Sequence, residues 1–170
     1  MNKIKLCQPV YKLKLPEHIL IKDVLLLLID ETKSYKSKVD NIASLDWEDA
    51  SNLKREWVSF FLPFWNMQVK NLLEDVNCSS IILHDIWFQQ YEKGGEHGWH
   101  THRGNFTGVY YLEFDKSSPK TEIIDPFSKR KITIKAKEGD MIFFPSHIRH
   151  RAPINNGKRK TIISWNFEVL

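Results

Sequence analysis

Residues 97–114 read HGWHTHRGNFTGVYYLEF, and the second half of this stretch predicts a β-strand because it is rich in aromatic and β-branched residues. Similar short runs lie on both sides of it, each bounded by turn-forming residues such as Gly, Pro, Asn and Asp. They are SSIILHDIWFQQYE at 79–92, KTEIID at 120–125, KITIKAK at 131–137, MIFFP at 141–145 and TIISWNFEV at 161–169. No helical segment alternates with these strands, so the pattern favours an antiparallel sandwich or barrel of the jelly-roll type.

The first half of the chain predicts helices instead. Pro16 suits the start of one helix, and Asp46 is expected to cap a second helix, which Pro63 should kink or split. In the first helix, six apolar side chains are expected to face inward: Ile19, Leu20, Val24, Leu25, Leu27 and Leu28.

The predicted fold class is therefore mainly β with N-terminal helices (α+β): a sandwich or barrel of the jelly-roll type, packed against helices. A length of 170 residues with 42% hydrophobic residues suits one domain spanning 1–170. Within it, residues 1–78 are expected to form a mostly helical support region and residues 79–170 the jelly-roll core.

Charge and cysteine content restrict the class of protein only loosely. The chain has 25 Lys and Arg against 21 Asp and Glu, a net charge of +4, which permits a nucleic-acid partner but does not require one. Cys7 and Cys78 are expected to be free thiols in a reducing compartment. The N-terminus does not resemble a signal peptide, and the apolar run at 24–29 is too short to cross a bilayer. We therefore expect a cytoplasmic protein without a membrane partner.

Three of the seven histidines form a pattern that suits a metal site. His100 and His102 are two residues apart, so on an extended strand they point to the same side, and His150 follows the run GDMIFFPSHIRH at 139–150. Neutral imidazoles bind redox-capable metals, and three of them leave coordination positions open for catalysis. The histidines at 18, 84 and 97 are each expected to be ordinary surface or core residues.

Three segments together resemble a known family: WFQQYEKGGEHGWHTHRGNFTGVYYLEF at 87–114, GDMIFFPSHIRHRAP at 139–153 and TIISWNF at 161–167. They are similar to the 2-oxoglutarate- and Fe(II)-dependent oxygenases, above all to small members encoded in phage and bacterial genomes. The resemblance covers roughly residues 80–169. It implies a double-stranded β-helix (jelly roll) packed against the N-terminal helices, with Fe(II) at its open mouth. It also implies a reaction in which 2-oxoglutarate and O2 hydroxylate a substrate and release succinate and CO2.

The resemblance also implies roles for individual residues. The family's metal site is an HxD or HxE pair with a distal histidine. His100 and His150 match two of these ligands, and His102 stands where the carboxylate is usual. The family's basic residue for the far carboxylate of 2-oxoglutarate falls on Lys160, with Arg159 as the second candidate. The same co-substrate would be contacted by Tyr111 or Tyr110 and by Ser164, and the substrate by Trp87, Gln89, Trp99 and Asn166.

Two alternatives stay open at this point. One is a cupin-type metal enzyme that does not use 2-oxoglutarate, although the glutamate that usually follows HxH in cupins is missing after His102. The other is a catalytically inactive barrel that acts as a binding module. The substrate is undetermined and includes small molecules, protein side chains and nucleobases, and the N-terminal helices would allow a homodimer.

Overall fold

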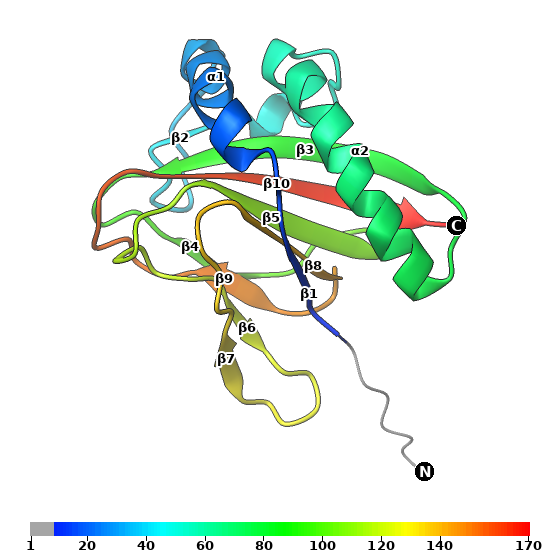
Figure 1. Cartoon of the computed structure of the whole chain (residues 1–170). Helices are drawn as coiled ribbons and strands as arrows, with labels where there is room; N and C mark the ends of the chain where they lie inside the picture. The colour runs from blue at the N-terminus through cyan, green and yellow to red at the C-terminus, as the bar shows by residue number, and fades with distance from the viewer. Residues whose placement is uncertain (1–8) are drawn as a thin grey trace.

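The computed structural model of the chain describes residues 9–170, and its strands form two antiparallel sheets (Figure 1). The larger sheet has six strands, in the order β1 (Tyr11–Lys14), β8 (Asp140–Pro145), β5 (Phe106–Glu113), β10 (Lys160–Val169), β3 (Ile81–Tyr91) and β2 (Ser44–Leu45). The smaller sheet has four strands, in the order β4 (His97–His100), β9 (His150–Ala152), β6 (Glu122–Ile124) and β7 (Lys131–Thr133). The other described elements are α1 (His18–Glu31), α2 (Glu56–Val76) and the 3-10 turn η1 (Trp47–Asp49).

The helices pack on one face of the larger sheet, and the smaller sheet lies on its other side (Figure 1). The alternation of side chains along β10 builds both layers. Ile162 points away from the helices and packs with Ile123 and Ala152 of the smaller sheet. The residues on its other face are buried beneath α1 and α2: Ile163, Trp165 and Phe167. The fold is thus mostly antiparallel β with two helices, as the sequence predicts, and a space lined by both sheets lies between them.

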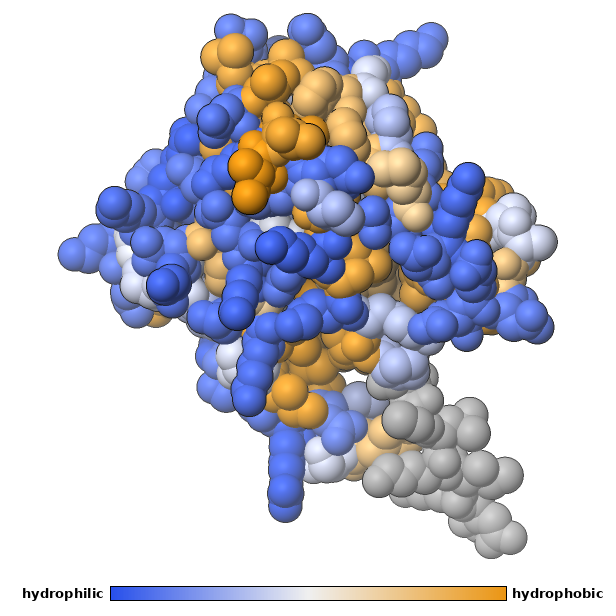
Figure 2. All heavy atoms as spheres, viewed as in Figure 1, coloured by the Kyte–Doolittle hydropathy of each residue, from blue (hydrophilic) through white to orange (hydrophobic). Residues whose placement is uncertain are grey.

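The inward face predicted for α1 is largely wrong. Ile19 and Leu20 are each 81% exposed, and Val24 and Leu27 are also exposed, whereas Leu25 is fully buried. The residues that face the core are His18, Ile21, Leu25 and Ile29. Apolar residues occupy nine of the fourteen positions of this helix, including the unbroken run 24–29, so the sequence pattern does not single out one face. Figure 2 shows the resulting apolar patch over α1.

Asp46 does not cap α2, which begins ten residues later at Glu56 and continues through Pro63. Its carboxylate is instead buried, 2% exposed, and accepts hydrogen bonds from the Arg55 guanidinium, from Trp57 Nε1 at 3.0 Å and from the backbone N–H of Phe88 at 2.9 Å. A charge that far from water needs such partners. Asp46 therefore anchors the segment before α2 to β3.

Residues 9–55 are less helical than predicted, because they also contribute the strands β1 and β2 and the turn η1. Cys78 is a free thiol, as predicted, and Cys7 lies outside the described residues. Among the described helices, none combines the length and the apolar character that crossing a bilayer requires.

Candidate metal centre and its two pockets

Three histidines converge between the two sheets. His100 in β4 and His150 in β9 are cross-strand partners, so their side chains share a face, and their ring centroids are 4.3 Å apart. His102 lies just past β4, where its backbone N–H donates to Ser146 O at 3.0 Å. Its ring centroid is 4.9 Å from that of His100 and 5.0 Å from that of His150. One nitrogen of each ring lies within 4.8 Å of the other two, a spacing that suits a common metal ion.

Hydrogen bonds to the backbone determine which nitrogen can bind the metal. His100 Nδ1 donates to Gly98 O at 2.7 Å, and His150 Nδ1 donates to Ile148 O at 2.9 Å. In each ring the Nε2 lone pair is then free to bind a metal. Metal-ligating histidines usually have this kind of partner on the second nitrogen, and it fixes the orientation of the ring.

Burial keeps the three imidazoles neutral. It lowers the pKa of His102 to about 3, with the nearby His100 and His97 adding to the effect. Burial and the neighbouring histidines also hold the pKa of His150 well below its usual range, and burial lowers the pKa of His100. Three unprotonated rings are therefore available as metal ligands at neutral pH.

A narrow cavity of about 20 Å³ extends from the histidines into the space between the sheets. Its walls include Tyr91, Thr121 and Ser164 as well as the three histidines. Lys160 is on the same face of β10 as Ser164 and is only 2% exposed, and its Nζ lies 4.4 Å from the centre of the Tyr91 ring. Burial lowers the pKa of Lys160 to about 8. The Tyr91 hydroxyl is buried without a hydrogen-bond partner among the described residues.

The other co-substrate candidates lie in different places. Tyr111 faces the cavity side, where its hydroxyl donates to Thr121 Oγ1 at 2.7 Å. Tyr110 faces the helices, where it stacks on Phe61 at 5.2 Å between ring centroids and its hydroxyl lies 2.7 Å from His18 Nδ1. The structure therefore brings Tyr111 near the cavity but does not bring Tyr110 there.

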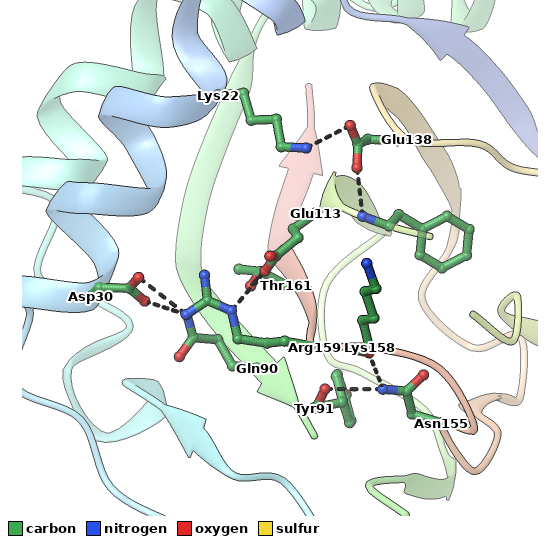
Figure 3. Close-up of polar contacts among 11 residues, drawn as sticks. Lys22, Asp30, Gln90, Tyr91, Glu113, Glu138, Asn155, Lys158, Arg159 and Thr161 are labelled. Atoms are coloured by element: carbon green, nitrogen blue, oxygen red, sulfur yellow. Dashed lines mark hydrogen bonds and ion pairs between the residues drawn. The ribbon is translucent and has the colours of Figure 1, made fainter. Parts of the chain in front are cut away.

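Arg159 does not line the cavity, and its guanidinium points toward Asp30 and Glu113 (Figure 3). Its Nε donates to Glu113 Oε2 at 2.8 Å, and its Nη1 donates to both oxygens of Asp30 at 3.1 Å. Burial alone would lower the pKa of Arg159, but the two carboxylates outweigh it and raise the pKa. Neighbouring residues on a strand face opposite sides, and here the guanidinium ties β10 to β5 and α1.

A wider groove of about 540 Å³ reaches His100 and His102 from solvent, but not His150. Trp87 and Gln89 line both this groove and the inner cavity, as the substrate prediction requires. Trp99 lines neither, because its ring lies beneath the guanidinium groups of Arg149 and Arg151. Asn166 also lies outside both pockets, and its side-chain amide donates to Asp85 at 3.3 Å.

Several residues of the site were not predicted from the sequence. The outer wall of the groove comes from the segment 35–48, including Asp40 and Trp47. The sequence of this segment has no helix- or strand-like spacing of apolar residues. His97, expected to be an ordinary turn residue, stacks on His100 with 3.8 Å between ring centroids. The sequence does not single out Tyr91 either, although Tyr91 pairs directly with Lys160 across β3 and β10.

No known family profile matches the chain, and no curated protein matches its sequence. Solved structures do match. A prolyl-4-hydroxylase from Pseudomonas putida aligns with a TM-score of 0.68 and 11% identity over 93% of this chain and 91% of its own. The viral collagen prolyl hydroxylase of Paramecium bursaria Chlorella virus-1 aligns with a TM-score of 0.66 and 17% identity, over 93% of this chain and 94% of its own.

A protein of the 2OG-Fe(II) oxygenase family from Burkholderia pseudomallei gives a TM-score of 0.74 and 11% identity, over 93% of this chain and 84% of its own. The resemblance inferred from the sequence is thus confirmed at the level of the fold.

Proposed function

We propose that this chain, which shares its fold with the 2-oxoglutarate- and Fe(II)-dependent oxygenases, is itself an enzyme of that kind. The observation that carries the proposal is the convergence of His100, His102 and His150 on a narrow cavity whose wall includes Tyr91, the residue beneath the buried ammonium of Lys160. The two sheets would then be the halves of a double-stranded β-helix with the metal near its open end.

The histidine cluster fits a divalent iron. Each ring is neutral at pH 7, and two of them already donate their Nδ1 proton to the backbone. Imidazole nitrogen is a good donor for Fe(II), and a three-ligand face leaves positions for other molecules. With His102 in place of a carboxylate, the protein ligands bring no negative charge to the ion.

We propose that a carboxylate of the co-substrate binds at the buried end of the cavity, beside Tyr91. Lys160 is a desolvated cation, and the Tyr91 hydroxyl is a donor without an acceptor among the described residues. A carboxylate of 2-oxoglutarate would satisfy both groups, and Ser164 and Thr121 provide further hydroxyls along the wall. Burial of a charge is favourable only with such a partner. Tyr111, through its bond to Thr121, would hold this wall in place.

When bound, Fe(II) and 2-oxoglutarate supply O2-dependent oxidation with release of succinate and CO2, and we propose that the oxidation is the hydroxylation of a substrate C–H bond. The chain's own residues position the reactants. Trp87, shared by both pockets and 3% exposed, would separate the co-substrate from bulk water, and Gln89 would orient the substrate from the groove. The substrate itself is a small molecule, a protein side chain or a nucleobase.

The test is aerobic incubation of the purified protein with Fe(II) and labelled 2-oxoglutarate, followed by mass spectrometry for succinate. We expect slow conversion even without substrate, lost in His100→Ala and in His150→Ala. His84→Ala is the matched control, because His84 is 41% exposed in its side chain and lies outside both pockets. Turnover that survives both ligand substitutions would contradict the proposal. A protein that binds iron but not 2-oxoglutarate would point to a cupin-type enzyme, and one that binds neither to an inactive barrel.

A further inference from the structure

The carboxylate of Asp40 joins the groove wall to the strand that carries a metal ligand. Asp40 lies on the loop 36–43 and lines the groove. Its Oδ1 accepts the backbone N–H of Gly98 in β4 at 3.0 Å, and its Oδ2 lies 3.4 Å from His97 Nε2. Its own N–H donates to Ser37 Oγ at 3.0 Å, which shapes the loop around the carboxylate.

Gly98 and His97, the two residues that Asp40 contacts, also contact His100. The carbonyl of Gly98 accepts the His100 Nδ1 proton at 2.7 Å. The His97 ring lies nearly parallel to the His100 ring, with 13° between planes and 3.8 Å between centroids. The Asp40 carboxylate therefore contacts both Gly98, whose carbonyl accepts the His100 proton, and His97, whose ring stacks on His100.

The polar contacts of the His97 ring suit a supporting residue rather than a metal ligand. Gln89 Nε2 donates to His97 Nδ1 at 3.3 Å, which leaves the proton of the neutral ring on Nε2, facing Asp40. With both ring nitrogens engaged, His97 has no free lone pair for a metal. Polar contacts thus link Gln89, His97 and Asp40 in series: a hydrogen bond from Gln89 to His97, and a 3.4 Å contact from His97 Nε2 to the Asp40 carboxylate.

We propose that Asp40 is a positioning residue: it fixes the orientation of His100 and thereby couples the groove loop to metal binding. This inference rests on the proposed function only in taking His100, His102 and His150 as ligands. Partners in the second layer around a metal commonly change its affinity ten- to a hundred-fold. Because coupling is reciprocal, a metal that favours one orientation of His100 also stabilises the loop.

The first test is titration with Co(II), followed by its visible absorption. We expect Asp40→Ala to bind Co(II) ten- to a hundred-fold more weakly, with a changed absorption band. Asp40→Asn keeps an oxygen acceptor for Gly98 N–H but turns its amide NH2 toward the His97 Nε2 proton, so it should recover only part of the affinity lost in Asp40→Ala. The control is Asn41→Ala, which removes the neighbouring loop contact to Gly94 O, at 2.8 Å, but leaves Gly98 and His97 untouched. It should bind Co(II) like wild type.

The second test is limited trypsin digestion, since Lys36 and Lys38 are exposed on the loop. Co(II) should slow cleavage after these two lysines severalfold in wild type and have little effect in Asp40→Ala. Cleavage within the exposed segment 129–131 serves as the internal control and should not change with Co(II).

Three outcomes would overturn the inference: wild-type affinity and spectrum in Asp40→Ala, equal weakening in Asn41→Ala, or no recovery in Asp40→Asn. Failure of the proposed function is distinct, because the wild-type protein itself would then bind no Co(II) or produce no succinate. The unfolding midpoints of the metal-free variants, measured in parallel, separate loss of the fold from loss of positioning.

Discussion

The ammonium nitrogen of Lys160 lies 4.4 Å from the centre of the Tyr91 ring, and the two residues are direct partners across β3 and β10. The contact recovers part of the solvation that burial removes from the cation, but far less than a carboxylate would. The lowered pKa of Lys160, about 8, reflects this incomplete compensation. Burial of Lys160 therefore costs the protein stability.

Lys160→Met should change binding and stability in opposite directions. Loss of the cation should weaken 2-oxoglutarate binding at least about 30-fold, since removing one partner of a buried charge pair costs about 2 kcal/mol or more. The ligand-free variant should be more resistant to denaturant than wild type, because it no longer buries a charge. Calorimetry and equilibrium unfolding measure the two effects, and Lys158→Met, at an exposed site on the same segment, is the control. Unchanged 2-oxoglutarate affinity would exclude Lys160 from the site.

The same lysine predicts a pH dependence of co-substrate binding. Burial lowers its pKa from 10.5 to about 8, so the ammonium form predominates below pH 8 and the neutral amine above it. A dicarboxylate needs the ammonium, so its apparent Kd should be constant at lower pH and rise about tenfold per unit above pH 8. Binding to the Mn(II)-loaded protein between pH 6.5 and 9.5 tests this. Lys160→Arg, which stays charged, should flatten the profile, and a flat profile in wild type would contradict the assignment.

His102 gives a prediction about metal affinity. His102→Asp would add one negative charge beside the ion and should tighten Fe(II) binding at least about tenfold, because a carboxylate attracts a dication strongly in a partly buried site. Anaerobic competition with a chelator measures the Kd. His84→Asp adds the same charge at an exposed position outside both pockets and should have no comparable effect. Weaker binding in His102→Asp would mean that the site requires the longer imidazole for geometric reasons.

The β half of this fold could be predicted from the sequence because strand alternation and turn residues are local signals. The convergence of His100, His102 and His150 followed from an HxH pair on one face of a strand together with the resemblance. The side chain of Lys160 shares a face with Ile162 and Ser164 for the same reason. Each of these inferences needed only the two-residue period of a strand.

Other features depend on contacts that the local sequence does not encode. Tyr110 and Tyr111 are adjacent, and only the pairing of β5 with β10, which sets Tyr111 opposite Ile162, decides which of them faces the cavity. The local sequence around Asp46 is typical of a helix cap, and it does not distinguish a capping aspartate from a buried one. The donors that hold its carboxylate come from α2 and β3, which lie beyond this local sequence. The groove wall at 35–48 is positioned by tertiary contacts such as that of Asp40 with Gly98.

Arg55→Met should destabilise the protein by about 3–5 kcal/mol, the usual result of leaving one member of a buried charge pair without its partner. The Arg55 guanidinium bonds to Asp46 and to the carbonyls of Ala50 and Ile86. Its loss leaves the buried Asp46 carboxylate without its charge partner and removes one hydrogen bond from each carbonyl. The turn η1 and Trp47 adjoin this network, so the groove wall should loosen as well. Urea unfolding measures the stability change, and Lys54→Met, an exposed neighbour, is the control. A loss below about 1 kcal/mol would show that the network does not anchor this segment.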